Sequence, residues 1–174
     1  MKKNINIIGI DQSLSCTGIT IVKNVNSLEE KKIYTLIKTK ANTDSGDRIY
    51  NIIDSITNIL KSNEIDYIAL EGLNLGAVKG NTARDLAGIY WAIIVLSKRL
   101  NIPYMVFSPK GVKKRALKGN AKKIECYNEL PESEKIAMKR TGAMKSTGLM
   151  DLSDSYWVYK CLLDELVKDG KVDS

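Results

Sequence analysis

The feature that most constrains the fold is a series of short β-branched segments that alternates with longer amphipathic segments. Residues 5–10 and 18–23 are rich in isoleucine and are separated by a polar turn, which is the pattern of a β-hairpin. Residues 33–38 are a third candidate strand, and short apolar segments recur at 67–70 and 104–107. Helical spacing between these strands predicts an α/β protein with a mixed five-stranded sheet flanked by helices.

Four segments carry signals of helices. Residues 47–62 have an apolar residue at every third or fourth position, which predicts a helix with one buried stripe. Residues 82–100 are apolar around most of the helix circumference, which favours burial on more than one side and makes a dimer interface a reasonable expectation. Ser108 followed by Pro109 is a typical helix start, and residues 151–167 are predicted to form the last helix.

Length and composition limit the class of protein. At 174 residues the chain is expected to be a single domain spanning residues 1–174. The longest apolar run, residues 86–96, is far shorter than the roughly 20 residues that a membrane-spanning helix needs. Cys16, Cys126 and Cys161 are scattered and odd in number, which favours reduced thiols in a cytoplasmic protein over a disulfide framework.

The positive charge of the chain is concentrated in one segment. Residues 98–145 contain 13 Lys and Arg against 4 Glu, which gives this segment a net charge of +9. The whole chain has a net charge of +7, so the remaining residues together carry −2. Such a concentration is typical of proteins that bind a polyanion. A solvated basic surface would give the same pattern.

Four acidic residues stand at positions where they could meet. Asp11 ends the first predicted strand and Glu71 ends the fourth, and strand carboxyl ends are where open α/β sheets place their ligands. Asp151 and Asp154 are three residues apart, so one helix face presents both carboxylates. Because the chain has no histidine, an all-oxygen cluster would favour Mg²⁺ or Mn²⁺ over zinc.

Each acid also has an ordinary structural explanation. Asp11 could form an Asx turn, and Glu71 could simply end a strand. Asp151 could cap its helix, with Asp154 near the positive end of the helix dipole. The joint arrangement of the four acids, in this order, favours a metal site.

Four segments together resemble the RuvC-type Holliday junction resolvases, which belong to the ribonuclease-H-like nuclease superfamily. In chain order they read IIGIDQSLSCTG, YIALEG, FSPKGVKKRALKGNAKK and DLSDSYWV. The first alone is weak, because actin-like and sugar-kinase folds also open with an acidic strand–turn–strand. The resemblance covers nearly the whole chain, and the Asn-, Ile- and Lys-rich composition suits a bacterial or bacteriophage protein.

The resemblance implies a ribonuclease-H-like fold and an endodeoxyribonuclease that resolves four-way junctions by paired nicks, leaving 5′-phosphate and 3′-hydroxyl ends. It implies that Asp11, Glu71, Asp151 and Asp154 are catalytic and bind two Mg²⁺ ions, for which Mn²⁺ can substitute. It also implies a homodimer that binds branched DNA, with no organic cofactor. The predicted DNA-contacting residues are Lys110, Lys113, Lys114, Lys118, Lys122, Lys123, Asn74 and Lys79. Asn74 stands where family members commonly carry an aromatic residue, which leaves recognition of the crossover open.

Three alternatives remain open. A phosphotransferase or ATPase of the actin and sugar-kinase type shares the acidic hairpin, but it needs a second lobe, and residues 72–80 have no Walker spacing. A non-catalytic junction-binding protein on the same fold would be indicated by the loss of a carboxylate. A related nuclease could instead cut other branched or hybrid substrates.

Overall fold

The computed structural model describes residues 4–73 and 80–173, and within them five strands form one mixed sheet. The strands are β1 (Ile7–Asp11), β2 (Cys16–Lys23), β3 (Lys31–Lys38), β4 (Tyr67–Glu71) and β5 (Tyr104–Phe107), in the spatial order β3-β2-β1-β4-β5. β1 lies antiparallel to β2 and parallel to β4, and β4 lies parallel to β5. The predicted mixed five-stranded sheet is therefore confirmed.

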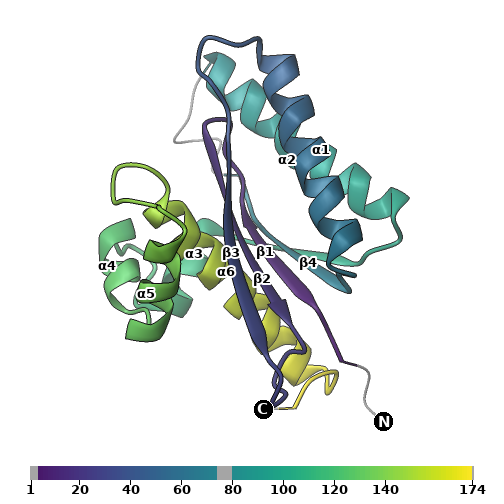
Figure 1. Ribbon diagram of the computed structural model, residues 1–174, viewed down its shortest axis with the longest axis vertical. Helices are drawn as coiled ribbons and strands as arrows, with labels where there is room; N and C mark the ends of the chain where they lie inside the picture. The colour runs from purple at the N-terminus through teal and green to yellow at the C-terminus, as the bar shows by residue number, and fades with distance from the viewer. Residues whose placement is uncertain (1–3, 74–79, 174) are drawn as a thin grey trace.

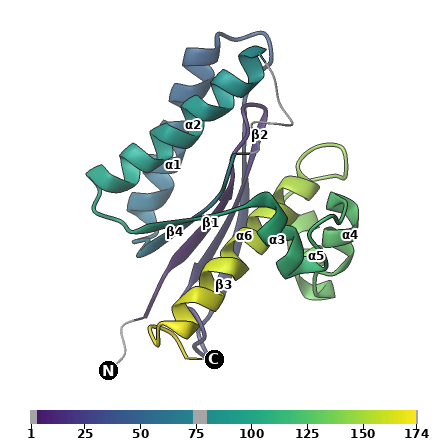
Figure 2. The ribbon, with the colours of Figure 1, turned by 180° about the vertical axis from the view of Figure 1, so that it is seen from behind.

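Helices cover both faces of the sheet (Figures 1 and 2). α1 (Ser45–Ser62) and α2 (Gly80–Arg99) lie on one face. The other face is covered by α6 (Leu149–Lys168), with three short helices packed beside it: α3 (Pro109–Ala116), α4 (Lys123–Asn128) and α5 (Glu132–Arg140). No helix within residues 4–73 and 80–173 is long and apolar enough to cross a membrane.

The face under α1 and α2 is packed almost entirely with branched aliphatic side chains. Ile8 and Ile10 alternate along β1 and point to this face, where they join Ile52 and Ile56 of α1 and Ile89 of α2. All five are fully buried, and burying each such side chain stabilises the fold by about 1.5–3 kcal/mol. This face is a closed core.

The opposite face allows α6 to lie directly on the sheet because two strand positions are glycine. A Cβ atom on Gly9 would lie 2.3 Å from the main-chain oxygen of Ser155, and one on Gly18 would lie 2.1 Å from that of Asp151. The hydroxyls of Thr20 and Ser155 are hydrogen-bonded at 2.8 Å across the same contact. The first turns of α6 are thereby held against the carboxyl end of β1.

The start of α6 also settles one alternative for Asp151. The residue before the helix is Gly148, with a left-handed φ of 107°, and the helix begins at Leu149. Asp151 therefore lies inside the first turn and is not the N-cap. Its carboxylate is free to face the sheet rather than the helix terminus.

Candidate functional site

The structure brings the predicted acids together at one edge of the sheet. Asp11 and Glu71 end β1 and β4, which are neighbouring parallel strands, and each carboxyl group influences the pKa of the other. Asp151 and Asp154 reach the same place from α6. Asp11 and Asp154 are only 6% and 7% exposed, so two of these carboxyls are almost removed from water.

A lysine from α4 lies among these acids. Lys123 Nζ is 2.6 Å from Asp154 Oδ2 and 3.6 Å from both Asp11 Oδ2 and Asp151 Oδ1. Burial alone would lower the pKa of Lys123, but the charges of Asp11 and Asp154 raise it overall. Lys123 was expected to contact DNA; the structure places its ammonium inside the carboxylate cluster, with half of the side chain exposed.

The cluster holds more negative charge than one ammonium balances. Burial raises the pKa of Asp11 well above its usual value; Lys123 opposes this effect, and the charges of Asp154 and Glu71 reinforce it. Burial also raises the pKa of Glu71 and of Asp154, against the lowering effect of the nearby Lys113 and Lys123 charges. Additional positive charge at this place would therefore favour the ionised carboxylates.

The chemistry of the donor set fits a hard divalent cation. Carboxylate oxygens are the ligands that Mg²⁺ and Mn²⁺ prefer. Burial raises the pKa of the neighbouring Cys16 thiol to about 11, with a further contribution from Asp151. In the part of the chain that the structure describes, no three Cys, Asp or Glu side chains are spaced to hold a metal ion as they stand. The cation that the acids surround is the Lys123 ammonium.

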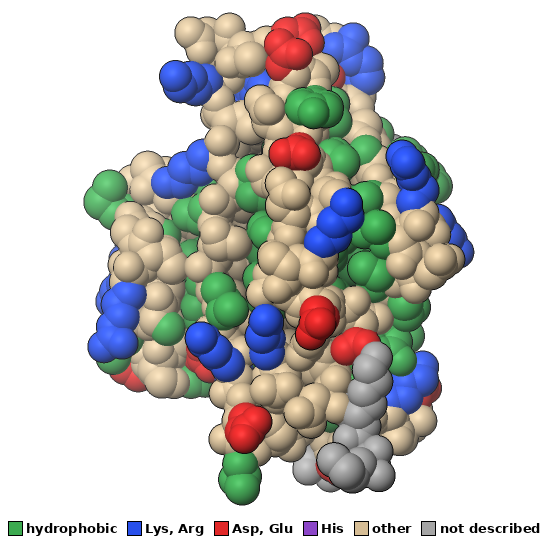
Figure 3. Space-filling model, turned by 45° about the vertical axis from the view of Figure 1, so that its right-hand side comes forward, with side chains coloured by type: hydrophobic (Ala, Val, Ile, Leu, Met, Phe, Trp, Pro, Cys, Tyr) green, Lys and Arg blue, Asp and Glu red, His purple; other side chains and the backbone are tan. Residues whose placement is uncertain are grey.

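The other predicted DNA-contacting lysines lie on α3 and in the segment leading to α4. Lys110, Lys114, Lys118 and Lys122 are exposed, and Lys113 is partly buried. Ser108 caps α3, accepting a hydrogen bond from the Gly111 amide at 3.1 Å, which confirms the predicted helix start. Asn74 and Lys79 lie outside the described residues. On the face shown in Figure 3, Lys and Arg side chains are interspersed with acidic and apolar ones and do not form a single patch.

Sequence analysis did not single out Gln12, which follows Asp11. Its side-chain Nε2 donates to the main-chain oxygen of Glu71 at 2.6 Å, and the residue is 7% exposed. Its Oε1 is buried and has no hydrogen-bond partner. No spacing rule points to this residue, because its contact joins two residues that are 59 positions apart in the sequence.

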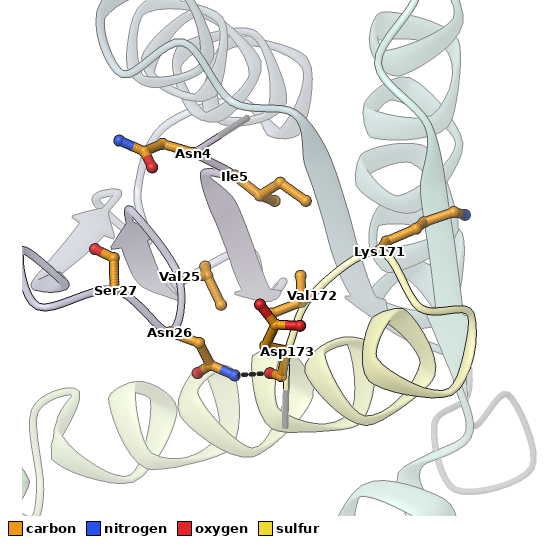
Figure 4. Close-up of a pocket in the computed structure, with 8 residues that line it drawn as sticks. All are labelled: Asn4, Ile5, Val25, Asn26, Ser27, Lys171, Val172 and Asp173. Carbon is orange, nitrogen blue, oxygen red and sulfur yellow. Dashed lines mark hydrogen bonds between the residues drawn. The ribbon is translucent and has the colours of Figure 1, made fainter. Parts of the chain in front are cut away.

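A cavity of about 130 Å³ lies at the opposite end of the sheet, between the turn after β2 and the segment after α6 (Figure 4). Asn26 donates from its side-chain amide to the main-chain oxygen of Asp173 across it. None of the predicted site residues lines this cavity. The acidic cluster therefore remains the candidate site.

The fold is similar to those of several solved Holliday junction resolvase structures. The structure is similar to Thermus thermophilus RuvC in complex with a Holliday junction substrate, with a TM-score of 0.62, 16% identity, and coverage of 88% of this chain and 90% of that chain. It is also similar to the yeast mitochondrial Holliday junction resolvase (TM-score 0.60, 12% identity, 91% and 77% coverage). The fowlpox virus resolvase in complex with Holliday junction DNA gives a TM-score of 0.54 at 17% identity, with 94% and 99% coverage. No curated protein sequence is significantly similar to the chain.

A family model described as crossover junction endodeoxyribonuclease RuvC matches residues 7–126. The match includes Asp11, Glu71 and Lys123 and ends before the acids of α6. It confirms the family that the four sequence segments indicated, and the solved structures confirm the predicted fold. The chain belongs to the RuvC family of crossover junction endodeoxyribonucleases, whose members depend on divalent metal ions.

Proposed function

We propose that the chain resolves four-way DNA junctions by hydrolysing phosphodiester bonds at two Mg²⁺ ions, for which Mn²⁺ can substitute. Asp11, Glu71, Asp151 and Asp154 would hold the metal. The observation that carries this proposal is the convergence of three of these carboxylates, from β1 and α6, on one cationic group. The ions would supply the positive charge that activates a water molecule and stabilises the departing 3′ oxygen, leaving 5′-phosphate and 3′-hydroxyl ends.

The residues of the chain have separable roles in this reaction. Asp11 and Glu71 fix the site to the sheet, whereas Asp151 and Asp154 close it from α6. Burial of Asp11 and Asp154 limits water at the reacting phosphate and strengthens electrostatic interactions there. Lys123, half exposed and mounted on the short helix α4, would exchange its place among the carboxylates for a contact with a phosphate oxygen.

The exposed lysines of α3 and the following segment would bind the DNA backbone. Lys110 and Lys114 lie on α3, Lys118 and Lys122 lie in the segment that leads to α4, and all four are exposed. Each lysine that neutralises a duplex phosphate makes log K fall by about 0.9 per unit of log salt concentration. Affinity for the junction should therefore decrease steeply with salt.

We further propose that the active form is a homodimer, with α2 at the interface. Trp91 and Val95 on the outer side of α2 are 59% and 56% exposed, although both are large and apolar. A cavity of about 460 Å³ lined by Ile53, Ala92 and Leu96 adjoins Val95 between α1 and α2. A second copy would cover this surface and supply the second site needed for paired nicks. Sedimentation of Val95→Glu should show monomers where the unchanged protein sediments as a dimer.

Cleavage of an end-labelled synthetic four-way junction tests the proposed activity. Linear duplex and a three-way fork serve as control substrates, with Mg²⁺ or EDTA and with Asp151→Asn beside the unchanged protein. Paired symmetric nicks in the junction, lost in EDTA and in the variant, are the expected result. Equal cutting of the fork would indicate a broader branched-DNA nuclease. Tight binding without cleavage would contradict the nuclease assignment.

A further inference from the structure

The position of Glu71 depends on contacts to strands on both sides of β4. On the β5 side the strand is held by regular pairing, Glu71 opposite Phe107, and by a 2.7 Å hydrogen bond from the Gly72 amide to the Phe107 oxygen. On the β1 side the ladder stops one residue earlier, at the pair Ile10 and Leu70. On this side, the main-chain oxygen of Glu71 accepts a hydrogen bond from the Gln12 side-chain amide at 2.6 Å.

Gln12 therefore extends the β1–β4 contact by one residue, at the point where both strands present a carboxylate. Asp11 precedes Gln12 directly, and Glu71 is the residue whose main chain it holds. A shift of β4 against β1 would change the separation of the Asp11 and Glu71 carboxyl groups, because these residues end the two neighbouring strands. Because Gln12 is anchored in the same chain segment as Asp11, its hydrogen bond couples the two acids through the backbone.

The Gln12 side chain does not satisfy all of its own hydrogen-bonding groups, so stability alone does not explain a glutamine at this position. Its Oε1 is buried without a donor, and an unpaired buried amide oxygen destabilises a folded protein. The last residues paired across β1 and β4, Ile10 and Leu70, are apolar and fully buried. An apolar side chain at position 12 would avoid the unpaired oxygen but would leave Glu71 without its donor.

We propose that Gln12 is a positioning residue for metal binding: by holding the Glu71 main chain, it fixes the Asp11 and Glu71 carboxylates at the separation at which they share a cation. This inference rests on the proposed function of the acidic cluster. Groups that orient metal-binding residues without touching the metal typically contribute 10–100-fold to metal affinity or activity. Gln12 acts from the position directly after β1, through a hydrogen bond to the backbone of the neighbouring strand.

Replacement by methionine separates this role from a structural one. Gln12→Met keeps an unbranched side chain, removes the hydrogen bond to Glu71 and also removes the unpaired Oε1, so its net effect on stability is small. The matched control is Asn6→Leu at the other end of β1. The Asn6 amide donates to the main-chain oxygens of Asn63 and Glu64 at 3.2 and 3.1 Å, an equivalent contact far from the acids.

The unchanged protein, Gln12→Met and Asn6→Leu are each titrated with Mn²⁺, and the concentration of free Mn²⁺ is measured by electron paramagnetic resonance. The melting temperature of each protein is measured in parallel. Gln12→Met should raise the Mn²⁺ dissociation constant by about 10-fold or more and change the melting temperature little. Asn6→Leu should lower the melting temperature and leave the dissociation constant unchanged. In cleavage, Gln12→Met should raise the Mn²⁺ concentration needed for half-maximal rate more than it lowers the rate at saturation.

Two results would overturn the inference. One is a Gln12→Met dissociation constant within twofold of that of the unchanged protein. The other is failure of both Gln12→Met and Gln12→Leu to fold, which would make Gln12 a structural residue. An unchanged protein that binds no Mn²⁺ would instead disprove the proposed function, so the two failures are distinct.

Discussion

The two ends of β1 show opposite uses of polar side chains. At the amino end, Asn6 donates its main-chain amide to Asp66 at 3.0 Å, donates its side-chain amide to two carbonyls, and accepts from the Asn24 amide at 3.1 Å. At the carboxyl end, Asp11 is buried against other acids with its pKa raised, and Gln12 Oε1 has no partner. One end is satisfied internally, whereas the other retains charge and an acceptor that its own fold does not satisfy. Such local conflict is typical of functional sites.

The strongest test of this contrast removes one charge at the carboxyl end. Asp154→Asn should reduce junction cleavage by more than about 100-fold, since Asp154 is proposed to bind the metal directly and losing such a group costs more than losing an outer partner. The same change should preserve or increase stability in EDTA, because it relieves a buried carboxyl whose pKa is raised by burial. Cleavage kinetics and urea unfolding provide the two measurements. Normal cleavage by the variant would remove Asp154 from the metal site.

Removing the hydrogen bonds of Asn6 at the amino end of β1 should lower stability and leave activity unchanged. Asn6→Leu removes three hydrogen bonds of the side chain and should lower the free energy of unfolding by about 2 kcal/mol. At a temperature where the variant is fully folded, its cleavage rate should match that of the unchanged protein. A large loss of activity would show that the two ends of β1 are not independent.

Removal of Lys123 should make the carboxyl end dependent on metal for its stability. Lys123→Met leaves the carboxylates without their cation and should cost about 1 kcal/mol in EDTA, a value reduced because the lysine is half exposed. Added Mg²⁺ should stabilise the variant more than the unchanged protein, because no ammonium competes for the site. Equal stabilisation of the two proteins would place the metal elsewhere. Thermal unfolding with and without Mg²⁺ provides the comparison.

The pH dependence of stability gives the smallest effect. A carboxyl whose pKa is raised by folding binds its proton more tightly in the folded state, so its stabilising contribution is present at low pH and is lost as pH rises through the folded-state pKa. In EDTA, the unchanged protein should therefore lose stability relative to Asp154→Asn as pH rises from the usual aspartate value of 3.8 towards neutrality. Parallel stability curves for the two proteins would contradict the direction of this pKa shift.

The sequence was sufficient to predict the five strands and the long helices α1, α2 and α6, because isoleucine spacing is a local signal that the core confirms; it did not predict the short helices α4 and α5. It also indicated why Asp11 and Glu71 end their strands, since neighbouring parallel strands present their carboxyl ends at one edge. It did not predict that Lys123 turns into the acidic cluster, because a lysine in a basic segment has the same local pattern whether it faces solvent or a buried charge. The contact between Gln12 and Glu71 was likewise inaccessible, since it depends on where the β1–β4 ladder ends.

The sequence also did not predict how α5 is attached to the sheet. Tyr34 on β3 donates to Glu134 on α5, and Lys32 pairs with the same carboxylate at 3.0 Å. Lys32 and Tyr34 both lie on β3, about 100 positions before Glu134. None of the three residues stands out from the sequence around it. Their contact holds the short helices against the edge of the sheet, on the side from which α4 delivers Lys123.

The direct seating of α6 on Gly9 and Gly18 has a consequence for biosynthesis. The two halves of the site are separated by 140 positions, from Asp11 to Asp151. This face of the sheet stays uncovered until α6 has left the ribosome, because α6 packs directly on it. Folding dominated by such distant contacts is slow compared with helix formation. A nascent or truncated chain without α6 carries only half of the acids and an uncovered sheet face. The proposed metal site therefore cannot assemble until synthesis has passed the last helix.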